Sequence, residues 1–286
     1  MLMKLSIITI NYNNAAGLQK TIESVLNQTS TDFEYIIMDG GSVDSSCRVI
    51  TDKGLVINGQ TEFNGISVTC VSEPDAGIYN AMNKGIRLAK GEYVQFLNSG
   101  DALVNPTITT QLLNALPAGC DIFYGNMLKP LSERIYRDCG LAGRKPTLFD
   151  FYKGTLNHSS AYIKRGLFDI YGLYDEKLKI VSDWKWYLQV IALGTIVPVY
   201  IDMDITVFDM HGISSTNPEL EKQERRLVLE ELIPSGILSD YDLYSEGIET
   251  SLRINKYIFS KRIVWFIDRV LFKLDEIKNT KKYRAE

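Results

Sequence analysis

The first hundred residues alternate between short, continuous apolar runs and segments whose apolar residues recur at helical spacing. Residues 5–10 form a β-branched apolar run, which is typical of a strand buried on both faces. Leu18, Ile22 and Val25 then recur at helical spacing. The same reading predicts further strands at residues 33–38, 66–71 and 92–97, and helices at 45–51 and 77–89.

Strands that alternate with helices predict an α/β fold with a mostly parallel central sheet flanked by helices. Ligands bind such sheets at the carboxyl ends of the strands. Polar segments follow the four predicted strands, so we expect a binding site at this edge. They are Asn11-Tyr12-Asn13, Asp39-Gly40-Gly41-Ser42, Ser72-Glu73-Pro74-Asp75 and Asn98-Ser99-Gly100-Asp101.

The second half of the chain has a mixed pattern. Residues 121–126 and 134–138 look like strands, and residues 195–208 are rich in strand-forming residues. Residues 184–193 are apolar on nearly every face, which predicts a buried helix. After residue 217 the pattern changes to charged helix, so we expect a C-terminal helical extension over residues 218–286.

Composition is that of an ordinary globular protein, with 45% hydrophobic and 23% charged residues among 286. The net charge of −4 gives no sign of nucleic-acid binding. The four cysteines are spread along the chain without a CxxC pair, which argues against a zinc site and fits a reducing compartment. With no secretory signal pattern at the N-terminus, we expect a cytoplasmic protein.

The last segment is basic, with ten Lys/Arg and three Asp/Glu between residues 253 and 284. It carries an apolar stripe at helical spacing, too short to span a bilayer. Such a helix either lies on an anionic membrane surface, at the inner face of the cytoplasmic membrane, or packs on the domain or on a second subunit of a homodimer. The stripe consists of Ile263, Phe266, Ile267, Val270, Leu271 and Leu274.

Two common nucleotide-binding signatures are missing from the sequence. No Gly-x-Gly-x-x-Gly follows the first strand, and no Gly-Lys-Ser/Thr loop occurs, which argues against a dinucleotide oxidoreductase and a P-loop enzyme. A divalent cation held by carboxylates is another common way to bind phosphates.

Six blocks occur in order along the chain, at residues 7–13, 39–44, 73–85, 91–93, 96–101 and 182–184. Together they resemble the large inverting glycosyltransferase family with the nucleotide-diphospho-sugar (GT-A) fold, commonly called family 2. The resemblance implies transfer of a sugar, with inversion, from a nucleotide diphosphate, most often UDP, to a saccharide or lipid-linked saccharide in bacterial glycan synthesis. It implies a nucleotide-sugar-binding half at 1–104 and an acceptor-binding half at 105–217.

The resemblance also assigns donor-binding residues. It implies that Asp39 accepts a hydrogen bond from the nucleotide base, since base edges offer N–H donors, and that Tyr12 lies near the same base. Asp75 would lie by the nucleotide and diphosphate. For Asp39 and Asp75 the alternative is a turn or helix cap. Asn13, Asn98 and Ser99 complete the expected donor site.

A Mg²⁺ or Mn²⁺ site is implied where the family has its Asp-x-Asp motif. Here Asn98 replaces the first Asp and Gly100 aligns with the second, so Asp101 is expected to be the main ligand. The alternative for residues 98–101 is an ordinary turn. His211 lies where a His of some relatives completes the metal shell or contacts the diphosphate.

Asp183 is the expected catalytic base, which takes the proton from the acceptor hydroxyl. It precedes an apolar helix, so we expect burial to raise its pKa towards the range of a general base; the alternative is a helix cap. His158 and Trp184 are expected on the acceptor side, although a lone His is as often structural.

Two other functions stay open. A sugar-phosphate nucleotidyltransferase uses a related fold but needs a Gly-rich basic loop after the first strand, where this chain has Asn11-Tyr12-Asn13-Asn14. A nucleotide-sugar-binding relative that has lost catalysis is favoured by the altered metal motif and opposed by the retained Asp101 and Asp183.

Overall fold

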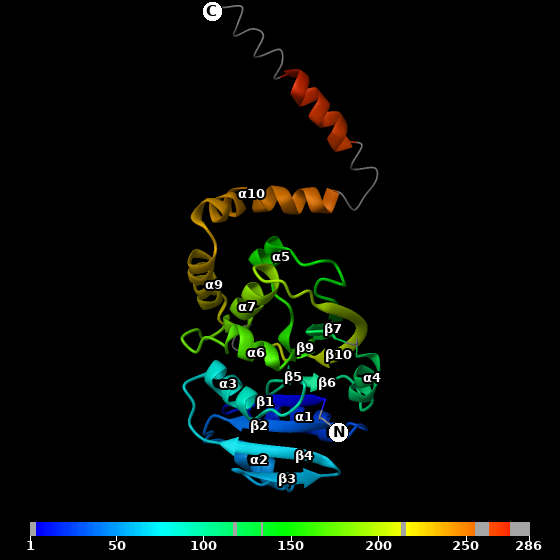
Figure 1. Cartoon of the computed structure of the whole chain (residues 1–286), viewed down its shortest axis with the longest axis vertical. Helices are drawn as coiled ribbons and strands as arrows, with labels where there is room; N and C mark the ends of the chain where they lie inside the picture. The colour runs from blue at the N-terminus through cyan, green and yellow to red at the C-terminus, as the bar shows by residue number, and fades with distance from the viewer. Residues whose placement is uncertain (1–3, 117–118, 133, 213–215, 255–262, 275–286) are drawn as a thin grey trace, which may run out of the picture. The chain divides into compact units, whose positions relative to one another are not determined.

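The structure is a computed structural model that describes residues 4–116, 119–132, 134–212, 216–254 and 263–274. Its contacts divide the chain into two compact units, Met1–Val228 and Leu229–Glu286. The first unit contains one large mixed sheet with helices on its faces (Figure 1). The predicted α/β fold class is thereby confirmed, whereas the division at residue 104 stays a prediction.

Four parallel strands form the first half of the sheet. The central strand β1 (Leu5–Asn11) lies between β2 (Phe33–Asp39) and β5 (Tyr93–Phe96), and β4 (Ile66–Ser72) follows on the far side of β2. All seven residues of β1 and of β2 are buried, as their continuous apolar runs predict. At the edge, β3 (Gly59–Phe63) pairs antiparallel with β4.

Helices cover both faces of these strands. On one face α1 (Ala15–Leu26) packs with α2 (Ser46–Asp52), and on the other α3 (Ile78–Leu88) packs on β1 and β2. A Cβ atom on Gly85 of α3 would lie 2.6 Å from a methyl group of Ile8. The glycine therefore lets α3 lie close to the sheet.

The second half extends the same sheet in mixed directions. The strand β9 (Ala161–Lys164) runs antiparallel between β5 and β7 (Ile122–Pro130). Beyond β7 comes β10 (Val199–Val207), which is parallel to β7 and antiparallel to the short β6 (Ala102–Leu103). The parallel arrangement that alternating strands and helices predict thus holds for the first half and for one pair in the second.

Shorter helices surround this half. The predicted buried helix at 184–193 begins as α7 (Ser182–Tyr187) and continues as a π-helical turn, η2 (Leu188–Ala192). The others are α4 (Ile108–Ala115), α5 (Leu148–Lys153), the 3₁₀ turn η1 (His158–Ser160) and α6 (Gly166–Tyr171). The predicted helical C-terminal region is present as α9 (Pro218–Leu232), α10 (Ser235–Ile254) and a helix over residues 263–274.

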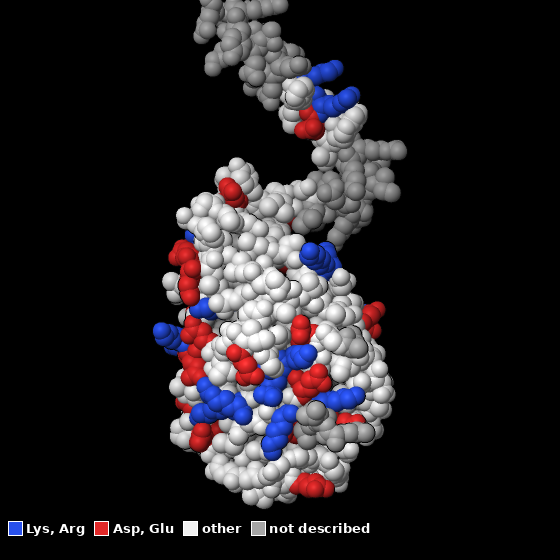
Figure 2. All heavy atoms as spheres, viewed as in Figure 1, with Lys and Arg blue, Asp and Glu red and all other residues white. Residues whose placement is uncertain are grey.

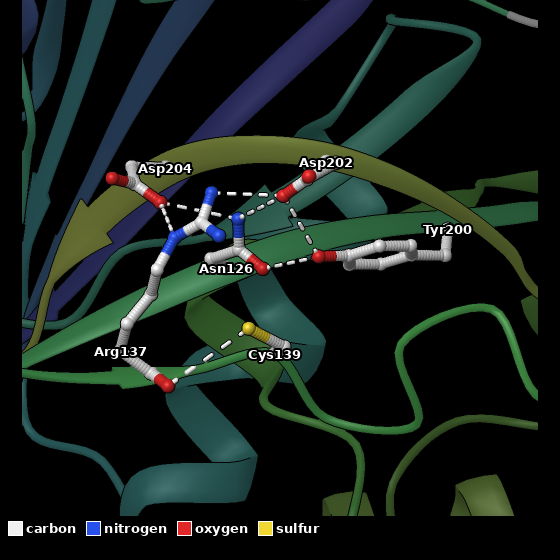
Figure 3. A network of polar contacts seen from close by, with 6 residues as sticks. All are labelled: Asn126, Arg137, Cys139, Tyr200, Asp202 and Asp204. Atoms are coloured by element: carbon white, nitrogen blue, oxygen red, sulfur yellow. Dashed lines mark hydrogen bonds and ion pairs between the residues drawn. The ribbon is translucent and has the colours of Figure 1, made fainter.

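Ion pairs hold the hairpin formed by β7 and β8 (Ile135–Asp138) against β10 (Figure 3). Arg137 on β8 donates to Asp202 at 2.8 Å and to Asp204 at 2.5 Å, both on β10. The buried Asn126 between them donates to the same two carboxylates. The network lies outside the cavity described below, since none of these residues lines it. Elsewhere acidic and basic side chains intermingle over the viewed face (Figure 2).

Candidate active site

One cavity lies at the carboxyl ends of the parallel strands. It has a volume of about 1010 Å³, and the loops after β1, β2, β4 and β5 form one of its sides. The second half of the chain also lines the cavity, with residues between 155 and 158 and between 179 and 184. Eight predicted site residues line this cavity: Tyr12, Asp75, Asn98, Ser99, Asp101, His158, Asp183 and Trp184. Asn13, Asp39 and His211 are not among the described residues that line it.

Asp39 ends β2 and is only 2% exposed. One carboxylate oxygen accepts from Asn11 at 2.7 Å and from the Ser42 hydroxyl at 2.6 Å, and the other accepts from the Ser42 amide at 3.0 Å and the Ser72 hydroxyl at 2.7 Å. Burial raises the pKa of this carboxyl, but the hydrogen bonds outweigh burial and hold the pKa below its usual range. The carboxylate thus joins the ends of β1, β2 and β4.

Tyr12 and Asp75 form the rim of the cavity next to Gly40. The Tyr12 side chain is 67% exposed, so its ring face is free to stack on a planar ligand. One Asp75 oxygen accepts from the Gly77 amide at 2.9 Å, and the other lies 2.5 Å from where a Cβ atom on Gly40 would be. Only glycine at position 40 leaves room for this approach.

Asn13 and Ser99 hold the same loops in position through hydrogen bonds. The Asn13 side chain accepts from the Val43 amide at 2.8 Å, and its backbone has a left-handed φ of 49°. The Ser99 hydroxyl donates to Asn11 at 2.7 Å. Both contacts tie the loop after β1 to neighbouring loops.

Asp183 receives partners from two distant segments. The Tyr79 hydroxyl on α3 lies 2.8 Å from one carboxylate oxygen, and His158 Nδ1 lies 3.2 Å from the other. On its other side, His158 Nε2 lies 3.2 Å from the amide nitrogen of Asn98. A chain of polar contacts therefore connects the expected base to the loop after β5.

The pKa of Asp183 differs from the expected value. Burial raises it, but the hydrogen bond and charge of His158, together with the Tyr79 hydroxyl, outweigh burial, and the pKa is lowered. The expectation of a raised pKa is therefore wrong. Residue 183 lies in the first turn of α7, and among the described residues no side chain forms a cap hydrogen bond at the start of this helix.

Asp101 is buried, with 2% exposure. Oδ1 accepts from the Asp209 amide at 2.8 Å, while Oδ2 has no hydrogen-bond partner in the described structure. Burial raises the pKa of this carboxyl to about 6, although the hydrogen bond from Asp209 opposes the rise. The amide oxygen of Asn98 is likewise buried without a described partner.

Trp184 and His211 lie in different surroundings. The Trp184 ring is 1% exposed, donates to the Phe151 carbonyl at 2.8 Å, and has the Arg225 guanidinium 4.6 Å from its centroid. The His211 side chain is 93% exposed, and its Nδ1 lies 2.8 Å from Asp209 Oδ1. Its assignment as a metal ligand stays a prediction.

Comparison with known proteins decides the family. A family model described as glycosyl transferase family 2 matches residues 6–140. An uncharacterized glycosyltransferase of Mycobacterium tuberculosis is 30% identical over 217 residues, which cover 73% of this chain and 76% of that protein. A PGL/p-HBAD biosynthesis glycosyltransferase of Mycobacterium bovis is 26% identical over 223 residues, with coverages of 77% and 82%. The chain belongs to glycosyltransferase family 2.

Solved structures share the fold of this family 2 glycosyltransferase. S. aureus TarS 1–349 in complex with UDP-GlcNAc matches with a TM-score of 0.62 at 18% identity, covering 80% of this chain and 66% of that one. Mannosyltransferase PcManGT from Pyrobaculum calidifontis, in complex with GDP-Man and Mn²⁺, gives 0.53 at 14% identity, with coverages of 90% and 82%. The match covers only 39% of a longer TarS chain. These likenesses confirm the predicted GT-A fold.

The residues at the expected metal position fit Mg²⁺ or Mn²⁺ in part. The unpartnered oxygens of Asp101 and Asn98 are the hard ligands that these cations prefer. The described residues contain no group of three or more His, Cys, Asp or Glu that could hold a metal on their own. Mg²⁺ in nucleotide enzymes is usually held by one or two carboxylates together with phosphates and waters, so the donor diphosphate would supply the remaining ligands.

Several site residues of this family 2 glycosyltransferase were missed in the sequence. Tyr79 belongs to a block that carries the resemblance, yet nothing local shows that it contacts Asp183. Asp209 lies 108 residues from Asp101, and its signal in the sequence is an acid two residues before the predicted His211. Lys179 and Arg225 add positive charge to the cavity wall.

Proposed function

We propose that this glycosyltransferase moves a sugar, with inversion, from a UDP-sugar to a hydroxyl group of a saccharide or lipid-linked saccharide in bacterial glycan biosynthesis. One observation carries the proposal. The ionised Asp183 and the unpartnered oxygens of Asp101 and Asn98 line a single cavity with the exposed ring of Tyr12. Sugar transfer of this kind needs a catalytic base, a cation site beside the diphosphate and an aromatic ring that stacks on the nucleotide base.

The donor would occupy the rim formed by the loops after β1, β2 and β4. Tyr12 would stack on the nucleotide base, and the Asp75 oxygen that does not contact the Gly77 amide would accept from a base or ribose donor. Asp39, Asn13 and Ser99 would act by holding these loops in position. UDP is the proposed nucleotide, supported by the TarS 1–349 complex with UDP-GlcNAc.

The transfer step follows from the state of Asp183. Its lowered pKa keeps the carboxylate ionised at neutral pH, so it can take the proton of the acceptor hydroxyl. The acceptor oxygen then attacks the anomeric carbon while the bond to the diphosphate breaks on the opposite face. When bound, Mg²⁺ or Mn²⁺ would neutralise charge on the departing diphosphate. His158 and Trp184 would form part of the acceptor side.

A donor screen tests this function. Purified protein is incubated with UDP-, GDP- and dTDP-sugars and Mn²⁺ or EDTA, and donor hydrolysis and transfer are followed. We expect one UDP-sugar to turn over, EDTA to stop turnover, and Asp183→Asn to lose about 10²- to 10⁴-fold in transfer while it still binds UDP. Wild-type transfer by Asp183→Asn would refute its role as the base.

The altered metal motif keeps a second candidate open, a nucleotide-sugar-binding relative with impaired catalysis. The observation that favours it is Asn98 in place of an acid. Binding of a UDP-sugar without hydrolysis or transfer, under all metal conditions of the screen, would support this reading over the first.

We further infer that the helix over residues 263–274 contacts the anionic inner face of the cytoplasmic membrane. Nine of its twelve residues are apolar, and each of their side chains is at least 43% exposed. Arg269 and Lys273 lie on the same helix, and the adjoining sequence is rich in Lys and Arg. Within the described part of the chain, every helix is too short or too polar to cross a bilayer.

Vesicle flotation tests the membrane contact. Full-length protein should float with phosphatidylglycerol vesicles and not with phosphatidylcholine vesicles. Replacing both Phe266 and Leu271 by Ser should weaken binding more than tenfold, because each buried side chain contributes about 1.5–3 kcal/mol. Exposed apolar residues elsewhere, Ile135→Ser with Ile170→Ser, serve as the matched control. Equal flotation of both variants would contradict the inference, and a dimer lost in the first variant would favour a subunit contact.

A further inference from the structure

Position 100, which aligns with the second Asp of the family's metal motif, has no room for a side chain in this structure. Gly100 has a φ of +107°, a conformation that other residues rarely adopt. A Cβ atom built on it would lie 2.2 Å from Oδ2 of Asp209. The Asp209 carboxylate therefore fills the space that a side chain at position 100 would need.

Strand pairing explains why Asp209 reaches this point. β10 pairs antiparallel with β6, with Val207 opposite Ala102, so the residues just after β10 meet those just before β6. The Asp209 amide donates to Asp101 Oδ1 at 2.8 Å, which holds the backbone of Asp209 against the Asp101 carboxylate. Asp209 Oδ1 contacts the amide and ring of His211, at 3.1 and 2.8 Å.

A second observation points to a ligand between these groups. Asp101 is 98% buried, and its Oδ2 has no described hydrogen-bond partner. Asn98 is half-buried, and its amide oxygen is buried without a described hydrogen-bond partner. Both residues line the cavity, and Asp209 lines it as well. Buried oxygens without a donor are costly unless a cation or water pairs with them.

We propose that Asp209 supplies the second carboxylate of the cation site and so replaces the acid that the family motif has at position 100. Asp101, Asp209 and the Asn98 amide would then present oxygen ligands to Mg²⁺ or Mn²⁺, with the rest coming from diphosphate and water. The inference rests on the proposed function, because the cation is the one that would accompany a nucleotide-sugar.

The test measures Mn²⁺ affinity directly, by electron paramagnetic resonance of free Mn²⁺ in the presence of UDP. Asp209→Asn keeps the shape and the contact with His211 but removes the charge. We expect it to weaken Mn²⁺ binding by about 10- to 100-fold. Asp202→Asn makes the same chemical change on β10 outside the cavity, and should bind Mn²⁺ like the wild type.

A second variant probes the packing. Gly100→Ala keeps every carboxylate but pushes its new methyl group against Asp209, so it should also weaken Mn²⁺ binding. If both changes act through the Asp209 carboxylate, the double variant should bind Mn²⁺ no more weakly than Asp209→Asn alone. Thermal melting of each variant reports whether the fold is retained.

The outcomes separate the two proposals. Wild-type Mn²⁺ affinity in Asp209→Asn, or fully additive losses in the double variant, would overturn the role of Asp209 and leave the proposed transfer intact. Absence of UDP and Mn²⁺ binding by the wild-type protein would overturn the proposed function, and the role of Asp209 with it.

Discussion

Replacing Asp39 by Asn perturbs the junction of three strands without changing its shape. An amide keeps one acceptor oxygen, so two of the four hydrogen bonds can persist, while its NH₂ group faces the Ser42 amide, which is also a donor. Hydrogen bonds to a charged group contribute about 1.5–3 kcal/mol each, and an unpaired buried donor costs about 1–3 kcal/mol. We expect the variant to lose about 2–4 kcal/mol of unfolding free energy at pH 7.

The loss should depend on pH in a definite direction. The pKa of Asp39 is lowered in the folded protein, whereas the unfolded value is about 3.9. Its contribution is therefore fully present above the unfolded pKa and disappears as the pH falls through the folded pKa. A protonated Asp resembles Asn, so the two proteins should approach equal stability at the lowest pH at which both fold.

Urea unfolding followed by fluorescence between pH 3 and pH 8 measures this difference. Asp32→Asn, an exposed acid just before β2, is the matched control and should stay within about 0.5 kcal/mol of the wild type. A difference for Asp39→Asn below that size at pH 7, or one that stays constant down to pH 3, would refute the reasoning.

Three further predictions follow from single contacts. Gly40→Ala would push Asp75 and Tyr12 apart, so it should weaken UDP binding about tenfold with little change in melting temperature. Unchanged affinity in a calorimetric titration would argue against a donor site at the rim formed by Tyr12 and Asp75. Tyr79→Phe removes a hydroxyl that lowers the pKa of Asp183, so the acid limb of the pH–rate profile for transfer should move to higher pH. An unmoved profile would mean that Tyr79 does not influence the catalytic base. Gly65→Ala, at a φ of +84°, should cost about 1 kcal/mol in urea unfolding, and no loss would mean that the β3–β4 turn tolerates other conformations.

The sequence was most informative where strands are buried on both faces. The continuous apolar runs at β1 and β2 leave few alternatives, and the structure has strands there within one residue of the prediction. The edge strand β3 was missed because its exposure alternates and it contains Gln60 and Glu62. The Asn64-Gly65 turn, with φ values of 49° and 84°, was the signal that could have revealed this hairpin.

The candidate site was only partly accessible from sequence, since its electrostatics depend on distant partners. The segment around Asp183 suggested a desolvated carboxyl, but Tyr79 and His158 approach from 104 and 25 positions away and reverse the shift. Asp209 was missed for a similar reason, because only the pairing of β10 with β6 brings it next to Gly100.

One continuous sheet joins both sides of the cavity, because β9 hydrogen-bonds to β5 on one edge and to β7 on the other. A hinge between the two sides would have to break these backbone ladders, so rigid-body opening and closing is costly in this protein. We therefore expect substrate entry and product release to depend on the loops beyond the strand ends, such as residues 208–212. Exchange of those loops is expected to change the sugar or the acceptor without disturbing the framework.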